Sequence, residues 1–330
     1  MNVNDIRPDD LQLGQELAAA RDVAWLAERR QEFVMVSCPA CGEATYETLY
    51  EKNGVPFVRC TRCRTQYANP RPPSSLLEEF YAKSENYIYF SKYIFPARLN
   101  QRREKLFRPR AQKLVEAISK YGKPGGALLE VGAAYGIFCD EVRALGKFDR
   151  IVALEPTPDL AQRCRDLGFE TIESPYEKVV LKTPVDVIAH FEVIEHLFDP
   201  GDFLEWCFNA LVPGGFIVCT CPNIEGLETL TAGAASNAVD HEHINLFSPS
   251  SLSHLFGHHG FQSVEILTPG ELDIDLLQRA LKSGLLTERD VDPVVLRLIT
   301  GELEIQHRFL HLLQDAGLTS NMMIVVRKPP

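Results

Sequence analysis

Residues 127–142 have the sequence Ala-Leu-Leu-Glu-Val-Gly-Ala-Ala-Tyr-Gly-Ile-Phe-Cys-Asp-Glu-Val. The short, mostly apolar run that ends at Val131 predicts a buried parallel strand, Gly132 to Gly136 predicts a tight turn, and the residues from Ile137 onward predict a helix. Glycine at both ends of the turn lets the backbone approach a ligand closely, and the first N–H groups of the helix point toward that ligand. The stretch therefore predicts a strand, loop and helix that cradle a nucleotide.

The spacing of the glycines distinguishes between two cofactors. A dinucleotide fingerprint needs glycines at its first, third and sixth positions, and the run from Gly132 to Gly136 does not have them. The pattern Glu-x-Gly-x-x-x-Gly instead resembles motif I of the class I S-adenosylmethionine-dependent methyltransferases, usually acid-x-Gly-x-Gly-x-Gly. Ala134 stands where that family has its middle glycine. The resemblance implies S-adenosylmethionine as cofactor, with Glu130, Gly132, Ala134 and Gly136 at its site.

Two further strands continue the pattern. Residues 149–155 predict a second buried strand that ends in Glu155, whose two oxygens match the two vicinal hydroxyls of a ribose. Pro156 follows directly. Residues 169–172 predict a third strand with Ser174 at its carboxyl edge, where an adenine amine is commonly held. Glu155, Pro156 and Ser174 therefore join the predicted cofactor site.

The fourth predicted strand, residues 185–190, ends at His190 and Phe191. Ligands of doubly wound sheets lie outside the carboxyl ends of the strands, so both residues are candidates for cofactor contact, and His190 also for chemistry. The segment from His190 to Leu197, followed by Asp199-Pro200, is similar to the Glu-Val-Leu-Glu-His segment of the ubiquinone-type and related small-molecule methyltransferases. With the turn at 211–215 and a fifth strand at 216–221, the resemblance covers about residues 120–268.

The resemblance implies an α/β fold. The expected core is a Rossmann-like, seven-stranded, doubly wound sheet of strand order 3-2-1-4-5-7-6, with an N-terminal zinc ribbon and helical additions. Residues 261–268 and the segment from Asn321 supply the last two strands, and a helical insertion spans about 271–318. The expected domains are an N-terminal helix (1–33), the zinc ribbon (34–73), a helical and aromatic lid segment (74–120) and the S-adenosylmethionine-binding domain (121–330).

The zinc ribbon is predicted from two Cys-x-x-Cys pairs, Cys38 with Cys41 and Cys60 with Cys63, separated by eighteen residues. Four thiolates at this spacing bind one structural Zn²⁺ with no open coordination position. Asn53-Gly54 between the pairs is a favoured hairpin turn. Redox-active cysteines are the alternative interpretation. Charges on the ribbon nearly balance, which favours a structural or substrate-shaping role over nucleic-acid binding.

Two segments before the predicted sheet leave alternatives open. Residues 10–33 have apolar residues at helical spacing, among them Leu13 and Leu17, and so predict a docking helix with one buried stripe. Residues 98–113 carry seven cations against Glu104 alone. Such a run is usually a solvated helix face, and the sharper hypothesis is a clamp for an anionic or phosphorylated substrate.

The loop after the fifth strand contains Asp240-His241-Glu242-His243. A metal pair is one interpretation of His-x-His, although a third ligand is not evident. Sugar C-methyltransferases with a comparable N-terminal zinc domain have Tyr-x-Glu-His at this point, and Asp240 stands in place of their tyrosine. We expect His243 or His241 to be the catalytic base with Glu242 orienting it, and His190 in reserve. The alternative is that the histidines only brace the loop.

Net charge and hydrophobic pattern limit the kinds of partner that the protein is expected to bind. The 330-residue chain has a net charge of −11, which argues against a general affinity for nucleic acid. No apolar run approaches the roughly 20 residues that span a bilayer, and the first residues do not resemble a targeting segment. We therefore expect a cytoplasmic protein without membrane contact. The helical insertion either covers the active site or builds a homodimer interface.

Together these patterns predict a methyltransferase that acts on a small polar metabolite. The expected acceptor is a hydroxyl of a sugar, a nucleotide-linked sugar or a glycan precursor, methylated by base-assisted in-line transfer. An RNA methyltransferase that uses the zinc ribbon for RNA is the alternative among enzymes. A non-catalytic protein that uses the fold for binding or as a scaffold is the alternative outside enzymes.

Overall fold

The computed structural model describes residues 2–330 and divides the chain into two compact units. The ribbon unit contains residues 2–98, 222–252 and 267–322. The sheet unit contains residues 99–221, 253–266 and 323–330. The chain therefore leaves the sheet unit after its fifth strand and again after its sixth, and each excursion adds structure to the ribbon unit.

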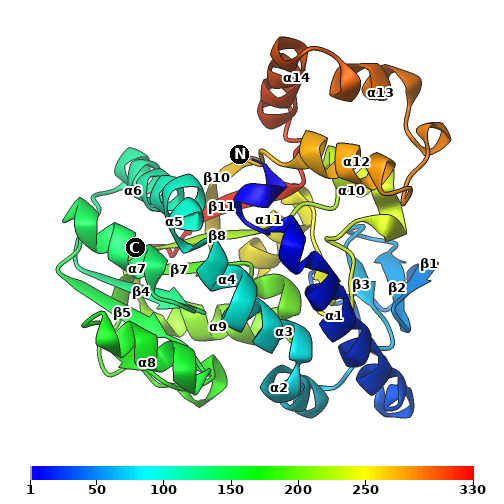
Figure 1. Cartoon of the computed structure of the whole chain (residues 1–330). Helices are drawn as coiled ribbons and strands as arrows, with labels where there is room; N and C mark the ends of the chain where they lie inside the picture. The colour runs from blue at the N-terminus through cyan, green and yellow to red at the C-terminus, as the bar shows by residue number, and fades with distance from the viewer. Residues whose placement is uncertain (1) are drawn as a thin grey trace. The chain divides into compact units, whose positions relative to one another are not determined.

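The sheet unit is built on seven strands in the order β10-β11-β8-β7-β4-β5-β6 (Figure 1). In chain order this is 3-2-1-4-5-7-6, read from the β6 edge, and the predicted topology is confirmed. The run from β6 to β8 is parallel throughout. The strands are β4 (Ala127–Val131), β5 (Arg150–Leu154), β6 (Glu170–Ile172), β7 (Val185–Phe191), β8 (Leu211–Pro222), β10 (Gln262–Leu267) and β11 (Asn321–Arg327).

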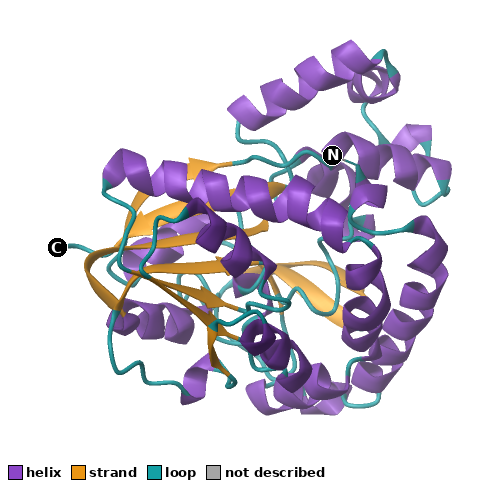
Figure 2. Ribbon diagram, turned by 60° about the vertical axis from the view of Figure 1, so that its left-hand side comes forward, coloured by secondary structure: helices purple, strands orange, loops and turns teal. Residues whose placement is uncertain are grey.

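Helices cover both faces of this sheet (Figure 2). Successive side chains of a strand point to opposite faces, and β7 shows this division. Val187 and Ala189 pack in a core with residues of α6 and α7, whereas the ring of His190 meets Phe203 of α9. The helical elements are α5 (Leu99–Arg102), the π-helical turn Arg103–Phe107, α6 (Arg108–Tyr121), α7 (Ile137–Leu145), α8 (Pro158–Asp166), the 3-10 turns Tyr176–Lys178 and Ile194–His196, and α9 (Pro200–Ala210). Helix α11 (Pro249–His258) runs from one unit into the other.

The ribbon unit contains a four-stranded sheet of order β1-β2-β3-β9. Strands β1 (Tyr46–Lys52) and β2 (Val55–Cys60) form the hairpin that Asn53-Gly54 predicted, and both turn residues have positive φ, 55° and 76°. Strand β3 (Gln66–Ala68) pairs antiparallel with β2 and also with β9 (Asn245–Leu246). Strand β9 closely follows the three candidate residues at 241–243. Its pairing with β3 therefore attaches their loop to the ribbon sheet.

The first helix differs from its prediction. Helix α1 (Gln12–Ala27) buries Ala18, Asp22 and Leu26, which recur at a spacing of four residues. Leu13 and Leu17, expected in the buried stripe, are 67% and 54% exposed. The predicted stripe was therefore wrong, because a small residue and a hydrogen-bonded carboxylate occupy the packed face instead of the larger leucines.

Further helices complete the ribbon unit. The segment after the ribbon forms α2 (Ser74–Lys83), α3 (Glu85–Tyr89), the π-helical turn Phe90–Ile94 and α4 (Phe95–Ala97). The later excursions form α10 (Leu227–Ala232), α12 (Asp273–Lys282), α13 (Pro293–Thr300) and α14 (Leu303–Asp315), with 3-10 turns at Val3–Asp5, Asp9–Leu11, Arg30–Glu32, Gly233–Ala235 and Glu288–Asp290. Among residues 2–330, the helices lack the combined length and apolar character needed to cross a bilayer.

The core between α6 and the sheet gives a stability prediction. Leu114 is fully buried there, so Leu114→Ala should lower the free energy of unfolding by about 2–5 kcal/mol through lost contacts and a cavity. Val180→Ala, at a position 92% exposed, should change it by less than about 0.5 kcal/mol. Urea denaturation followed by circular dichroism measures both. Equal effects of the two variants would contradict this assignment of the core.

Candidate cofactor and catalytic sites

The turn between β4 and α7 adopts the conformation that its glycines permit. Gly132, Ala134 and Gly136 have φ of 74°, 46° and 67°. A Cβ atom on Gly132 would lie 3.1 Å from Cγ2 of Val193, so the backbone is closely covered there. Ala134 adopts the left-handed conformation of a glycine at a cost of about 1–2 kcal/mol. The loop therefore has the backbone conformation of a glycine-rich turn, although its middle residue carries a Cβ atom.

Glu155 is held at the end of β5 by this same turn. Its Oε2 accepts a hydrogen bond from the Ala134 N–H at 2.7 Å, and its Oε1 accepts one from the Thr157 N–H at 2.9 Å. The side chain is buried, and burial raises the pKa of the carboxyl. Pro156 next to it is exposed, and half-buried Ser174 follows β6 and donates to the Pro175 carbonyl at 3.1 Å.

Glu130 and Arg110 are two ionisable side chains of the sheet unit; Glu130 is buried, and the side chain of Arg110 is 12% exposed. Glu130, in β4, is 3% exposed, and burial raises the pKa of its carboxyl to about 8. Its Oε2 accepts from the Cys139 thiol at 3.0 Å. Arg110 projects from α6 with its guanidinium 4.4 Å from the centre of the Phe191 ring and 3.8 Å from Oε1 of Glu192. Burial lowers the pKa of Arg110, and the nearby carboxylates, including Glu130, oppose that shift.

The sequence did not single out Arg110. It is one of seven cations between residues 98 and 113, and only its position on the inward face of α6 separates it from the others. Arg103 instead pairs with Asp140 at 2.7 Å and with Glu141 at 2.8 Å, and Arg108 pairs with Glu141 at 2.9 Å. These ion pairs with α7 favour the helix-face interpretation of the basic run over the anion clamp.

His190 is the next-to-last residue of β7, and its side chain is fully buried. Its ring meets Phe203 edge-on with 5.1 Å between the ring centres, and within residues 2–330 neither ring nitrogen has a hydrogen-bond partner. Burial lowers the pKa of this imidazole to about 3, so the ring is neutral at pH 7. The catalytic role stays a prediction, and the surroundings favour a packing role.

His243 lies in the ribbon unit, in the loop before β9. Its Nδ1 is 2.9 Å from the carbonyl oxygen of Ala238, and because a carbonyl can only accept, Nδ1 carries a proton. A neutral ring then presents Nε2 as the acceptor, which is the tautomer that a base needs. Asp240 shapes the loop, since its Oδ1 accepts from the N–H groups of Glu242 and His243, both at 2.8 Å. The contacts that orient His243 therefore come from Ala238 and Asp240.

Glu242 and His241 point elsewhere in the same unit. Oε1 of Glu242 accepts from Nδ2 of Asn86 at 2.6 Å, and burial raises the pKa of this carboxyl. His241 is 4% exposed and lies edge-on against Phe80, with ring centres 5.7 Å apart. His241 and Glu242 thus lie close together, with Nε2 of His241 3.8 Å from Oε1 of Glu242, and the catalytic roles of all three residues remain predictions.

The four predicted zinc ligands come together in the ribbon. The Sγ atoms of Cys38 and Cys63 are 3.5 Å apart, those of Cys41 and Cys60 are 3.6 Å apart, and all four lie within 4.8 Å of one another. A tetrahedral ion with Zn–S bonds of about 2.3 Å places its sulfurs roughly 3.8 Å apart. The hydrogen bond between the thiols of Cys38 and Cys63 lowers the pKa of Cys63 and raises that of Cys38, so the two side chains share one proton. The cluster fits a structural zinc ion and leaves no position for a substrate.

A parallel sheet with this strand order, and with a glycine-containing turn and an acid at the ends of β4 and β5, defines a nucleotide-binding α/β protein. Comparison with known families makes the class specific, because a family model described as a methyltransferase domain matches residues 100–266. The chain belongs to this family, the class I S-adenosylmethionine-dependent methyltransferases.

Curated relatives match only parts of the chain. A ubiquinone biosynthesis O-methyltransferase of Caulobacter vibrioides is 26% identical over 118 residues, which are 31% of this chain and 46% of that protein. The C-methyltransferase NovU of Streptomyces niveus is 27% identical over 165 residues, 48% of this chain and 38% of that protein. The chain thus spans less than half the length of either relative.

Solved structures resemble the chain more distantly. An S-adenosylmethionine-dependent methyltransferase from Thermotoga maritima aligns with a TM-score of 0.47 and 17% identity, and the alignment covers 72% of this chain and 97% of that one. Structural similarity with so low a TM-score and sequence identity does not support a conclusion about function. The fold assignment rests on the strand order.

The cysteine cluster gives a metal prediction. Cys60→Ser should lower zinc content from one ion per chain and destabilise the ribbon, because a four-thiolate site contributes folding free energy. Elemental mass spectrometry of the purified protein measures the zinc. Cys207→Ala, at a buried cysteine outside the cluster, is the control and should keep the full equivalent. Full zinc in the Cys60 variant would refute the site.

Proposed function

We propose that the protein transfers a methyl group from S-adenosylmethionine to a hydroxyl of a small polar metabolite of the sugar, nucleotide-linked sugar or glycan-precursor class. The observation that carries the proposal is the arrangement at the carboxyl ends of β4, β5 and β7. A left-handed turn, a buried acid after β5, buried Glu130 and the mostly buried guanidinium of Arg110 lie at this edge of the sheet. Family membership supports the cofactor.

The adenosine half of the cofactor has its own set of residues. Glu155 would accept the ribose hydroxyls, exchanging its bonds to the turn for bonds to the ligand. Gly132, Ala134 and Gly136 would leave room for close approach of the backbone, and Ser174 and Pro156 would border the base.

The amino-acid half needs opposite charges, and the sheet unit offers both. Arg110 would hold the carboxylate, since a guanidinium binds a carboxylate with two parallel hydrogen bonds. Glu130 would accept the ammonium group. Burial disfavours the charged form of each side chain, so a ligand that carries both charges relieves the two penalties at once. The ring of Phe191 stabilises the guanidinium of Arg110 by a cation–π contact.

The bound cofactor supplies an activated methyl group on a sulfonium, so the protein has to align the acceptor, exclude water and remove a proton. His243 would remove that proton through Nε2, because Nδ1 donates to the Ala238 carbonyl. General base catalysis of this kind typically contributes about 10²- to 10⁴-fold.

The substrate class rests on similarity and charge. Relatives named as an O-methyltransferase of ubiquinone biosynthesis and as a C-methyltransferase support a small acceptor. The net charge of −11 gives little support to the RNA alternative. A scaffold role would predict that S-adenosylhomocysteine does not bind, which calorimetry decides directly.

The role of Arg110 can be tested with two ligands that share the adenosine group. Arg110→Ala should weaken S-adenosylhomocysteine binding about 10- to 150-fold, the equivalent of about 1.5–3 kcal/mol for a charged hydrogen bond. Binding of 5′-methylthioadenosine, which lacks the amino acid, should stay the same. Arg103→Ala, whose residue pairs with α7, is the control for isothermal titration calorimetry. Equal losses for both ligands would rule out a carboxylate contact.

The role of His243 can be tested by separating binding from turnover. His243→Ala should lower the single-turnover rate of methyl transfer to a panel of nucleoside diphosphate sugars by about 10²- to 10⁴-fold. The affinity for S-adenosylhomocysteine should remain that of the wild type, because the residue acts on the acceptor. His254→Ala removes an exposed histidine and serves as the control. An unchanged rate in the His243 variant would exclude this base.

A further inference from the structure

Three potential metal ligands that are far apart in the sequence meet in the ribbon unit. Asp22 comes from α1, and His241 and Glu242 come from the loop before β9. One ligand atom of each lies within 4.8 Å of the corresponding atom of the other two. We propose that Asp22, His241 and Glu242 bind one divalent transition-metal ion, at a site separate from the four cysteines.

His241 is the observation that points to a ligand. The side chain is 4% exposed, and among residues 2–330 neither ring nitrogen has a hydrogen-bond partner. Burying an imidazole without partners is costly, and buried polar groups in proteins almost always have one. Nε2 lies 3.8 Å from Oε1 of Glu242, which is too long for a hydrogen bond and short enough for two ligands of one ion. A metal ion would bind one of these two nitrogens, and the geometry favours Nε2.

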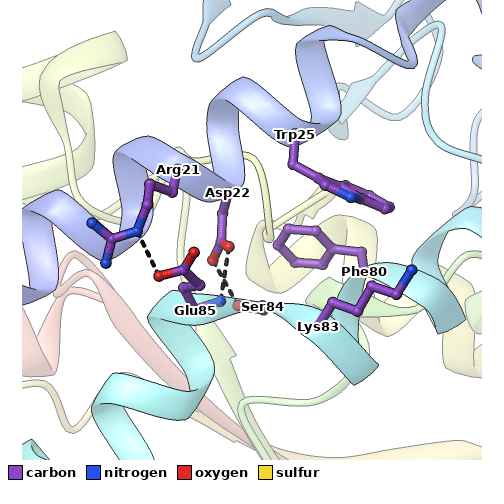
Figure 3. Close-up of a pocket in the computed structure, with 7 residues that line it drawn as sticks. All are labelled: Arg21, Asp22, Trp25, Phe80, Lys83, Ser84 and Glu85. Carbon is purple, nitrogen blue, oxygen red and sulfur yellow. Dashed lines mark hydrogen bonds and ion pairs between the residues drawn. The ribbon is translucent and has the colours of Figure 1, made fainter.

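The carboxylates of the cluster are already oriented. Oδ2 of Asp22 accepts from the Ser84 hydroxyl at 2.7 Å, and its Oδ1 accepts from the Glu85 N–H at 2.8 Å (Figure 3). Oδ2 also accepts from the Asn86 N–H at 2.9 Å. Oε1 of Glu242 accepts from the side chain of Asn86 at 2.6 Å. A carboxylate has about four lone-pair sites, so the three hydrogen bonds to Asp22 leave it room for an ion. Outer hydrogen bonds of this kind fix metal-binding carboxylates in place.

A purely structural role explains only part of the cluster. Asp22 accepts from the first residues of α3 and so stabilises the start of that helix, which accounts for its burial. That role needs no histidine nearby, and it leaves both nitrogens of His241 without partners. The metal site accounts for all three residues together.

The ligand set and its surroundings indicate the kind of ion. One imidazole and two carboxylates suit first-row divalent ions such as Mn²⁺, whereas thiolates select zinc, so the two sites of the chain would prefer different metals. A pocket of about 100 Å³ borders the cluster and is lined by Asp22, Ser84 and the rings of Trp25 and Phe80 (Figure 3). Phe80 also packs against His241, so the pocket and the cluster share Asp22 and the ring of Phe80 as a common wall.

The proposal assigns His241 and His243 different tasks. A metal ligand must keep its lone pair on the ion, so His241 would not act as the base, and His243 is the residue left for proton removal. The metal site does not depend on the proposed methyl transfer, since its test measures binding of an ion.

The test uses the full chain with its cysteine site loaded with zinc. Titration with Mn²⁺, followed by electron paramagnetic resonance, should show one bound Mn²⁺ per chain in addition to the zinc, and electron spin-echo modulation should detect coupling to an imidazole nitrogen. Asp22→Asn and His241→Ala should abolish this binding. Ser84→Ala, which removes an outer hydrogen bond, should weaken it about 10- to 100-fold. Glu85→Gln is the matched control, because Glu85 lines the same pocket but pairs with Arg21.

Each result decides the question. No bound Mn²⁺ in the wild type, or bound Mn²⁺ without nitrogen coupling, overturns the proposal without recourse to any variant. Binding that persists in His241→Ala, or that is lost equally in Glu85→Gln, also overturns it. Binding lost only in Asp22→Asn and His241→Ala, with zinc content unchanged, supports it.

Discussion

Backbone pairing between β3 and β9 fixes the loop on which the chemistry of the ribbon unit depends. Gln66 and Tyr67 lie opposite Leu246 and Asn245, and the Ala68 N–H donates to the Ile244 carbonyl at 2.9 Å. A buried bond from Nη1 of Arg71 to Oδ1 of Asn245, 2.7 Å long, reinforces this pairing. The candidate ligand and base residues directly precede β9. Their positions therefore depend on a ribbon whose hairpin is closed by the cysteine cluster, and the predicted zinc would act on the loop through the sheet rather than by contact.

The parallel direction of the strands explains why the ionisable residues of the sheet unit lie together at one edge. Parallel strands bring their carboxyl ends to one edge, so the acids after β4 and β5 and the side chains after β7 collect there. Burial raises the pKa of Glu130 to about 8 and lowers that of Arg110, so each is held in surroundings that disfavour its charged form. Such a site is costly in stability, and a ligand with both charges lowers that cost. Strain at Ala134 belongs to the same edge, where the backbone keeps the path that a nucleotide requires.

Features encoded locally in the sequence were predictable. The motif at 127–142 and the segment at 190–197 carry the family resemblance that implied the strand order, and the cysteine cluster followed from the spacing of the cysteines. What was missed depends on contacts between distant segments. In the sequence Asp22 resembles any charged residue of an amphipathic helix. Only the structure shows that it accepts hydrogen bonds from Ser84 and Asn86. Arg103, in the π-helical turn, pairs with α7, whereas Arg110, in α6, lies near Glu192, and the sequence alone does not distinguish the two arginines. Strand β9 has two residues, too few for any alternation to show.

Asp240 shows how a departure from a motif changes the physics of a loop. Sugar C-methyltransferases similar to this chain have a tyrosine at its position, and a phenol hydroxyl lies too far from its own backbone to accept from N–H groups two and three residues later. The Asp240 carboxylate accepts both and closes a tight turn, so the backbone itself sets the direction of His243. The Ala238 carbonyl then selects the tautomer. The other oxygen of Asp240, Oδ2, lies 3.6 Å from Nδ1 of His243, so one carboxylate both shapes the turn and borders the imidazole. Under the proposed function Asp240 would position the base, and a hydroxyl acceptor would need only that one base.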